Sequence, residues 1–209
     1  MGAPGMTSPI RSEAFQNLQL NAGIFLKNFD YSSITSASAL KTAISAAISA
    51  NTNVLGCTRG GGSFTVTREI REPEIDGKRY AFVGDKFVDS MDAYLSTTLV
   101  EMNIETFETA FGTATVTTNG NKKTLKVGTA IDTDDYIEKL CWVGDLADGR
   151  NVLINLANAL NTSDITFTFT DKGEGTLPVE FHAHQADVLD YDYAPFEIVY
   201  FDDPVTGGT

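Results

Sequence analysis

The 209-residue sequence predicts a mainly β protein, an antiparallel β-sandwich or barrel with one or two short helices and a long protruding arm. Three observations predict this class. Apolar and polar residues alternate with period two in several segments, as in half-buried antiparallel strands. Tight-turn dipeptides separate those segments, and helical periodicity is confined to two short stretches. No linker or internal repeat divides the chain, so we expect a single domain over residues 1–209.

The first regular element in chain order is a helix predicted over residues 38–51. Its apolar stripe comprises Leu40, Ile44, Ala47 and Ile48, and Ser or Thr residues are available as an N-cap. A second, shorter helix is predicted from Asn103, which caps it, to Gly112, which ends it. Amphipathic helices of this kind usually cover a core, so we expect both to plug the sandwich or cover a sheet edge.

Residues 56–87, between the two helices, are predicted to leave the sandwich as an extended loop or hairpin arm. Three glycines precede a strand-like segment, Pro73 interrupts any central strand, and Asp76-Gly77 favours a tight turn. The two chain ends, residues 1–19 and 202–209, have the composition of mobile tails. Arm and tails are features of proteins that assemble.

A long alternating segment follows over residues 88–102. Its core-facing set is Met91, Ala93, Leu95 and Leu99, and the opposite set is the polar row Ser90, Asp92, Tyr94, Ser96 and Thr98. Because the polar row carries no apolar anchor, we expect it to face water.

The second half of the chain predicts further antiparallel strands. Asn119-Gly120 and Asp148-Gly149 each lie between two strand-like segments and indicate hairpins. A half-buried strand is predicted over residues 164–170, with Ile165, Phe167 and Phe169 pointing inward. After the turn at residues 171–175, a last alternating strand points Leu177, Val179, Phe181 and Ala183 inward.

The charge excludes a protein that grips nucleic acid. The net charge is −13 and the isoelectric point is near 4.4, whereas phosphate binding needs clustered Lys and Arg. The charge is also uneven: acids are concentrated in residues 171–203, whereas residues 57–88 are mixed, with six basic residues, four of them arginines, against five acids. Two readings stay open: these segments meet between copies of the chain, or the acidic surface only aids solubility.

Two cysteines, Cys57 and Cys141, are too few for a disulfide framework and lack the CxxC spacing of redox and zinc sites. We expect both to be reduced structural residues. No apolar run approaches the ~20 residues that span a bilayer, and the N-terminus has no export signal. The expectation is a chain folded in a cytoplasm, without a membrane partner.

The segment His182-x-His184 is the strongest enzymatic lead. On a strand both rings would share one face with Glu180. A metal site needs more ligands, but the sequence has no third histidine, and Asp187 is the remaining candidate. We interpret both histidines as residues of a structural strand, at a subunit contact or at the surface, and expect no metal ligand.

No other motif supplies a catalytic apparatus. The glycines at 60–62 lack the spacing of a phosphate loop, no GxSxG elbow occurs, and neither cysteine has the context of an activated nucleophile. The acid-rich segments 132–136 and 187–193 lack the Gly and the terminal Glu of a calcium loop. We therefore predict a protein that is not an enzyme, with no catalytic residue and no cofactor.

Two segments resemble a known family. Residues 55–102, with a glycine motif followed by a charged stretch and a long strand, and residues 153–184, around "DKGEGTLPVEF", resemble the major tail proteins of long-tailed bacteriophages. The similarity covers about residues 22–185. The residues that match the glycine motif are Gly56, Thr58, Arg59, Gly60, Gly61 and Phe64. Cys57, where a small residue is expected, and the helix near residues 40–48 depart from the family pattern.

The resemblance implies a tail tube subunit of the phage tail tube β-sandwich type. Six copies would form a ring whose inner sheets join into a barrel, and rings would stack into a tube that conducts DNA without binding it specifically. The implied partners are further copies, a tape-measure protein, a tail terminator and baseplate or distal tail proteins. The implied location is the virion tail, assembled in the bacterial host cytoplasm.

The resemblance also implies roles for two sets of residues. The glycine-motif residues would start the arm, which reaches a neighbouring subunit and also carries Arg68 and Arg71. The polar row Ser90, Asp92, Tyr94, Ser96 and Thr98 is the candidate lining of the lumen, or else an outward solvent face.

The alternative is a monomeric Ig-like binding module, such as a carbohydrate-binding or adhesin domain. It would need an exposed aromatic platform, for which Tyr191, Tyr193 and Phe196 are the clustered candidates. A metal enzyme built on His182 is a more distant alternative.

Overall fold

The computed structural model describes residues 15–169, 171–186 and 192–203. These residues form nine strands and two α-helices: β1 (Ile24–Lys27), α1 (Ala37–Ala50), β2 (Thr58–Arg71), β3 (Phe87–Leu99), α2 (Ile104–Phe111), β4 (Ala114–Asn119), β5 (Lys122–Val127), β6 (Ile137–Asp145), β7 (Asn151–Asn161), β8 (Leu177–His182) and β9 (Phe196–Phe201), with a short 3-10 turn at Thr133–Asp135. All strand pairs are antiparallel. The predicted mainly β, antiparallel class is confirmed.

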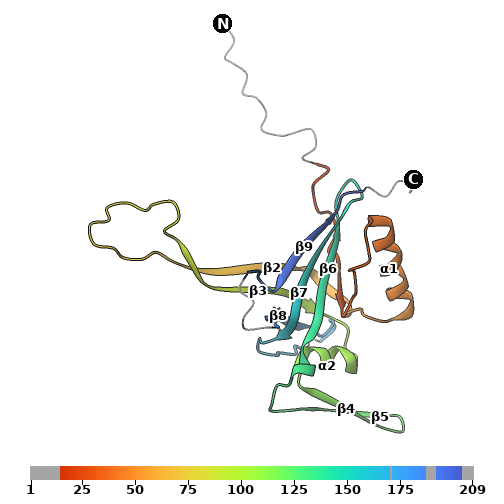
Figure 1. Ribbon diagram of the computed structural model, residues 1–209. Helices are drawn as coiled ribbons and strands as arrows, with labels where there is room; N and C mark the ends of the chain where they lie inside the picture. Colours follow the sequence, from red (N-terminus) through yellow and green to blue (C-terminus); the bar gives the residue numbers. More distant parts are fainter. Residues whose placement is uncertain (1–14, 170, 187–191, 204–209) are drawn as a thin grey trace.

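Strand β7 connects two layers of sheet. Along one edge it pairs with β6, and along the other it pairs first with β9, over residues 151–156, and then with β8 through Leu160 and Asn161. Between these two partners Asn158 adopts a positive φ of 45°, which bends the strand. The helix-side layer is therefore β1-β6-β7-β9, and the hairpin layer is β8-β3-β2 (Figure 1).

The main core lies between these two layers. Its central residues are Phe25, Leu95, Leu99, Leu140, Leu156, Leu177, Val179 and Phe181, each at most 2% exposed. Ala93, Leu95 and Leu99 of β3 and Leu177, Val179 and Phe181 of β8 point inward as the alternating sequence predicts, and Ala183 packs half-buried beside them. Met91, predicted in the same inward set, is 40% exposed because it lies on the part of β3 that projects beyond the core. Period-two patterning therefore identified the hairpin layer correctly.

Helix α1 covers the other face of the helix-side layer and encloses a second core. That core contains Leu26, Phe29, Leu40, Cys141, Val143, Leu153 and Phe201. Ser36 caps α1 through a bond from the Ala39 amide, and Asn51 ends it in a left-handed conformation. The predicted helix is confirmed, but Ile48, assigned to its buried stripe, is 53% exposed because the buried contacts come from the N-terminal half of the helix.

The second predicted helix and both predicted hairpins are confirmed. Asn103 caps α2 by accepting the Thr106 amide at 2.7 Å, and Gly112 follows its last turn. The turn at Gly120 joins β4 to β5, and the turn at Gly149 joins β6 to β7. No helix among the described residues is long and apolar enough to cross a membrane.

The strand predicted over residues 164–170 is wrong for its described part. Residues 164–169 form only an isolated bridge from Thr168 to Thr176, and Phe169 is 82% exposed, although Ile165 and Phe167 pack against the main core. The side-chain oxygen of Asn161 accepts the Glu180 amide at 3.1 Å, which ends the β7–β8 ladder before a further strand can extend it.

The predicted tails are shorter than expected where the structure describes them. Leu18 and Leu20 bond to the backbone at the end of β6, and Asp203 accepts the Ala37 amide at 2.9 Å. Residues 1–14 and 204–209 lie outside the described residues.

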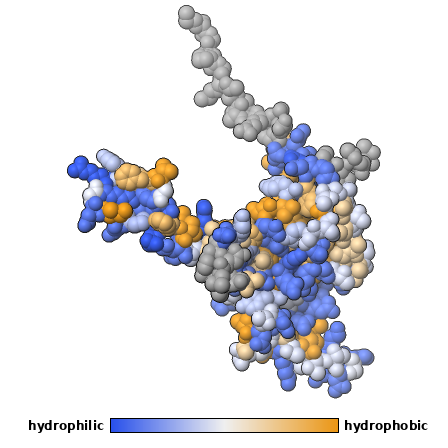
Figure 2. All heavy atoms as spheres, viewed as in Figure 1, coloured by the Kyte–Doolittle hydropathy of each residue, from blue (hydrophilic) through white to orange (hydrophobic). Residues whose placement is uncertain are grey.

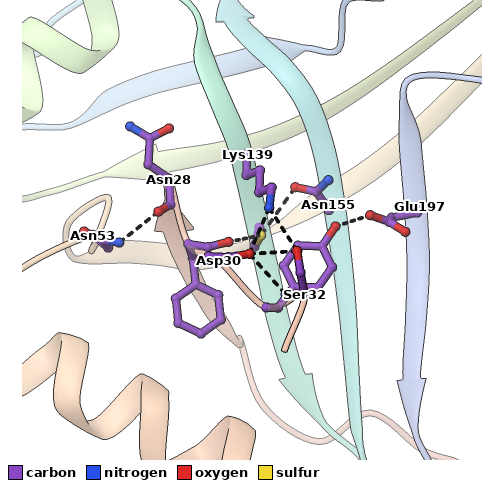
Figure 3. Close-up of polar contacts among 10 residues, drawn as sticks. Asn28, Asp30, Ser32, Asn53, Lys139, Asn155 and Glu197 are labelled. Atoms are coloured by element: carbon purple, nitrogen blue, oxygen red, sulfur yellow. Dashed lines mark hydrogen bonds and ion pairs between the residues drawn. The ribbon is translucent and has the colours of Figure 1, made fainter. Parts of the chain in front are cut away.

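The connection from β1 to α1 is fixed across the helix-side layer by polar contacts (Figure 3). Asp30 accepts bonds from Ser32 and from Lys139 of β6, and these contacts lower the pKa of Asp30 to about 2. The Tyr31 hydroxyl donates to Glu197 of β9, and burial together with this carboxylate raises the pKa of Tyr31. Residues 30–32 therefore link β6, inside the helix-side layer, to β9 at its edge.

We predict that Tyr31→Phe lowers the free energy of unfolding by about 1.5 kcal/mol, because a hydrogen bond to a charged group is lost with little change in packing. Urea denaturation measures this loss. The control is Tyr80→Phe, since Tyr80 is 78% exposed. Equal stability of the two variants would contradict the role given to Tyr31.

Candidate functional site

The hairpin formed by β2 and β3 projects far from the body of the protein (Figure 1). Its root, where residues 58–64 pair with residues 95–99, belongs to the sandwich, and its outer part runs from Arg68 and Met91 to the loop at residues 72–86. The predicted arm is thus present as a β-hairpin. It begins inside the sheet, because β2 is already paired from Thr58 onward.

The glycine motif lies at the root of the hairpin. Gly60 and Gly61 have φ values of 76° and 75° and form a bulge in the pairing of β2 with β3. The Thr97 hydroxyl donates to the Gly61 carbonyl at 2.6 Å. A Cβ on Gly62 would lie 2.7 Å from the Phe25 ring, so this position admits only glycine without rearrangement. The motif therefore fixes how the arm leaves the body.

The structure separates the predicted contact residues into two groups. Gly56, Thr58, Arg59, Gly60, Gly61 and Phe64 lie at the root, where Arg59 pairs with Glu174 and Phe64 packs on Phe196 with ring centroids 5.3 Å apart. Arg68 and Arg71 lie on the projecting part, where Arg71 pairs with Asp89 at 2.9 Å. Only the second group is placed to reach beyond the body of its own chain.

Ion pairs hold the loop at residues 72–86, the hairpin tip. The Lys78 ammonium lies 2.6 Å from carboxylate oxygens of both Glu72 and Asp85 and is only 10% exposed. Lys86 pairs with Glu72, and the Asp85 carboxylate also accepts the Phe82 amide at 2.7 Å. The bonds from Lys78 and Phe82 lower the pKa of Asp85. These contacts link the two sides of the loop and favour a defined arrangement of the tip.

The projecting hairpin carries many exposed apolar side chains. These are Ile70, Ile75, Tyr80, Phe82, Val83, Phe87, Val88 and Met91, with exposures from 40% for Met91 to 109% for Val83. Figure 2 shows hydrophobic residues among the charged ones along this segment. Exposed apolar surface of this extent on a projecting element is typical of a protein contact.

The polar row lies on the outer face of the hairpin layer. Ser90 and Asp92 are exposed, and Tyr94, Ser96 and Thr98 are partly exposed. The predicted division of this strand into a buried and a polar face is confirmed from Ala93 to Leu99, whereas Met91, predicted on the buried face, is exposed. Neighbouring strands add Ser63, Thr65 and Thr67 on one side and Glu180 and His182 on the other. The result is a continuous face of hydroxyls and carboxylates.

His182 connects two carboxylates on this face. Its Nδ1 lies 2.9 Å from Asp92, its Nε2 lies 3.0 Å from Glu180, and its ring stacks on Tyr94 at 4.9 Å. Burial of the ring opposes its charged form, but the two carboxylates outweigh burial and raise the pKa of His182 above 6.5. Both ring nitrogens can donate only in the protonated state, so this geometry favours imidazolium.

His184 does not join His182 in a site. Its Nδ1 faces the Asn158 carbonyl at 3.1 Å, and its ring meets Tyr136 edge-on. No group of three or more His, Cys, Asp or Glu side chains within the described ranges is arranged to hold a metal, and Asp187 lies outside them. A metal centre at the histidine pair therefore gains no support from the geometry.

The cysteines offer no activated nucleophile. Burial raises the pKa of Cys141 to about 12, and its thiol faces the Asn155 side-chain oxygen at 3.4 Å (Figure 3). Partial burial and the nearby Glu101 carboxylate raise the pKa of the exposed Cys57. Both are free thiols. Thiolate chemistry requires the opposite shift.

The aromatic platform required by a binding module is incomplete among the described residues. Tyr193 is 82% exposed, but Phe196 packs on Phe64 in the core, and Tyr191 lies outside the described ranges. A hollow of about 380 Å³ at the hairpin root is lined mainly by glycines and small hydroxyl residues, and offers a sugar no aromatic face.

Sequence reasoning found the arm and the polar row but missed two features. The Lys78 ion network was not anticipated, although the alternating charges of residues 72–86 contain its signal. The pairing of His182 with Asp92 depends on the register between β3 and β8, which the sequence does not display.

Comparison with protein-family models and with curated proteins identifies no relative of this chain. No protein-family model matches the chain, and no curated protein matches it significantly. The functional reading therefore depends on the residues and surfaces described above.

We predict that Asp92→Asn lowers the pKa of His182, because one of the two carboxylates that stabilise the imidazolium is neutralised. Proton NMR titration of the ring signals measures the change. The control is Asp89→Asn on the same strand, which removes the partner of Arg71 instead. An unchanged His182 titration in Asp92→Asn would show that the contact does not persist in solution.

The same contact has a defined effect on stability. Because the pKa of His182 is raised in the folded state, the contact contributes fully to the free energy of unfolding below pH 6.5. This contribution is lost as the pH rises through the folded-state pKa. The stability difference between the wild type and Asp92→Asn should therefore shrink at alkaline pH.

We predict that Lys78→Met increases hydrogen exchange in residues 72–86 and leaves the sandwich unaffected, because the cation between Glu72 and Asp85 is removed. Mass spectrometry of the exchanged peptides measures this. The control is Lys123→Met on the exposed strand β5. Unchanged exchange in the tip of Lys78→Met would contradict the role of Lys78.

The Asp85 carboxylate gives the tip a pH dependence. Since the pKa of Asp85 is lowered in the folded state, protection of the tip of the wild type from hydrogen exchange should persist above pH 3.8 and be lost as the pH falls through the lower folded pKa.

Proposed function

We propose that this chain is a structural subunit that self-assembles, as hexameric rings stacked into a tube of the bacteriophage tail type. The observation that carries the proposal is the β2–β3 hairpin, which extends exposed apolar side chains away from a folded body. A monomer gains nothing from such an element, and its exposure is an aggregation hazard unless another copy covers it. The sequence resemblance described above supports the same conclusion.

The hairpin is built for contact between subunits. Its root is fixed by the glycine bulge, and its tip is ordered by the ion pairs of Lys78. An ordered element loses less conformational entropy when it binds than a flexible loop does. The arm can therefore join copies firmly through a modest contact area.

The polar face of the hairpin layer suits the wall of a DNA conduit. Glu69, Asp92 and Glu180 line it together with hydroxyl residues, and the chain has a net charge of −13. Carboxylates repel phosphates, so a duplex passing this face would slide without binding. His182 offsets part of the local charge while it holds β3 and β8 together.

The partners follow from this assembly. They are further copies of the chain, a tape-measure protein inside the growing tube, and a tail terminator and baseplate or distal tail proteins at its ends. The proposed location is a virion tail assembled in a bacterial cytoplasm. No cofactor and no catalytic step enters the proposal.

Negative-stain electron microscopy and sedimentation velocity across a concentration series test the assembly. We expect rings or hollow tubes of uniform width. The double variant Phe82→Ser/Val83→Asp should stay monomeric with an unchanged unfolding midpoint, because both side chains are exposed, at 63% and 109%. Val127→Asp, on the exposed strand β5, is the matched control and should assemble. Normal assembly of the double variant would contradict the role of the tip.

A further inference from the structure

The hairpin layer leaves part of the helix-side layer uncovered. At one end of β9, Phe196 packs against Phe64 in the core. The next two residues on the same face, Ile198 and Tyr200, are 46% and 60% exposed. Ile154, which pairs with Ile198 across β7, is partly exposed beside them. These residues, Ile154, Ile198 and Tyr200, form the β9 patch.

The β9 patch is an unprotected sheet surface. Among the described strands β9 pairs with β7 alone, so its other edge is open. Figure 2 shows hydrophobic residues gathered on the body beside the root of the hairpin, over β9. An open edge with an exposed apolar face is a feature that soluble proteins usually cover.

We propose that the β9 patch is the docking surface for the hairpin tip of a second copy of this chain, an inference that rests on the proposed self-assembly. The tip carries Tyr80, Phe82 and Val83, which are 78%, 63% and 109% exposed. Its own chain does not cover them, because the pairing of β2 with β3 directs the tip away from the body (Figure 1). The β9 patch of another copy would supply an apolar surface whose shape is fixed by the paired strands β7 and β9.

One charge pair is compatible with this pair of surfaces. Asp202 follows β9 on the same face as Ile198 and Tyr200 and stays 80% exposed although Arg150 lies 3.4 Å away. Glu197 and Asp203 lie on the opposite face of the layer, where they accept bonds from Tyr31 and from the Ala37 amide. The hairpin presents two exposed arginines, Arg68 on the outer part of β2 and Arg79 at the tip. Lys78 is held between carboxylates of its own tip, which leaves Arg79 as an exposed base that can meet Asp202, although the exposed acids Glu74 and Asp76 lie near it in the chain. Burial of apolar side chains is therefore the main contribution to this contact, and a pair between Arg79 and Asp202 would add to it.

The contact can be mapped by photo-crosslinking in the full-length protein. A photoreactive benzoylphenylalanine replaces Val83 in one batch, and the second batch is the wild-type chain labelled with ¹⁵N. The two are mixed, assembled and irradiated, and the crosslinked peptides are identified by mass spectrometry. We expect the tip to be joined to a labelled peptide that contains residues 196–201. Crosslinks only to labelled peptides elsewhere, or none in assembled material, would overturn the docking surface.

A pair of matched variants tests the energetic role of the patch. Ile198→Glu should raise the concentration needed for assembly by about ten-fold or more, because it places a charge in an apolar contact. Ile48→Glu is the control, since Ile48 is similarly exposed on α1, at 53%. Circular dichroism of each monomer establishes that both variants fold. Equal assembly of the two variants would overturn the inference and leave the proposed function standing, whereas a wild-type chain that never assembles would overturn both.

Discussion

The rest of the structure depends on the shared pairing of β7. One edge of this strand bonds to β9 and then to β8, so a single strand belongs to both layers. The bend at Asn158 turns the second half of the strand toward the hairpin layer, and the side chain of Asn161 then ends the ladder. Because backbone bonds set the angle between the layers, the main core closes around Leu156 and Phe181 without a separate linker.

The same pairing determines where the molecule is exposed. The helix-side layer is covered by α1 on one face and only partly by the hairpin layer on the other, which leaves Ile198 and Tyr200 open to solvent. The hairpin layer in turn extends β2 and β3 past the end of the core, so the apolar residues of their outer halves contact only the opposite strand of the hairpin in the described structure and stay exposed. The two exposed apolar surfaces, the β9 patch and the outer part of the β2–β3 hairpin, thus both result from the way β7 joins the two layers.

Charge divides the surface into regions with different uses. On the polar face, carboxylates are spaced by hydroxyls and held by His182, which keeps the face negative and well ordered. At the hairpin tip, acids and bases neutralise each other around Lys78, and the result is rigidity with little net charge. A negative face and an arm whose tip is linked by ion pairs are two properties that the proposed self-assembling conduit would need, and both arise from short contacts within the hairpin layer.

The sequence by itself determined the elements whose signal is local. Alternation predicted the buried faces of β8 and of β3 from Ala93 to Leu99, capping residues predicted both helices, and glycine turns predicted the hairpins, since each depends on a few neighbouring residues. Only the tertiary structure decided that residues 164–169 form no strand, that Ile48 is exposed, and that His182 meets Asp92 rather than His184. These outcomes depend on which strand edges are already paired and on cross-strand register. Contacts between residues distant in the sequence fix both, so no local pattern encodes them.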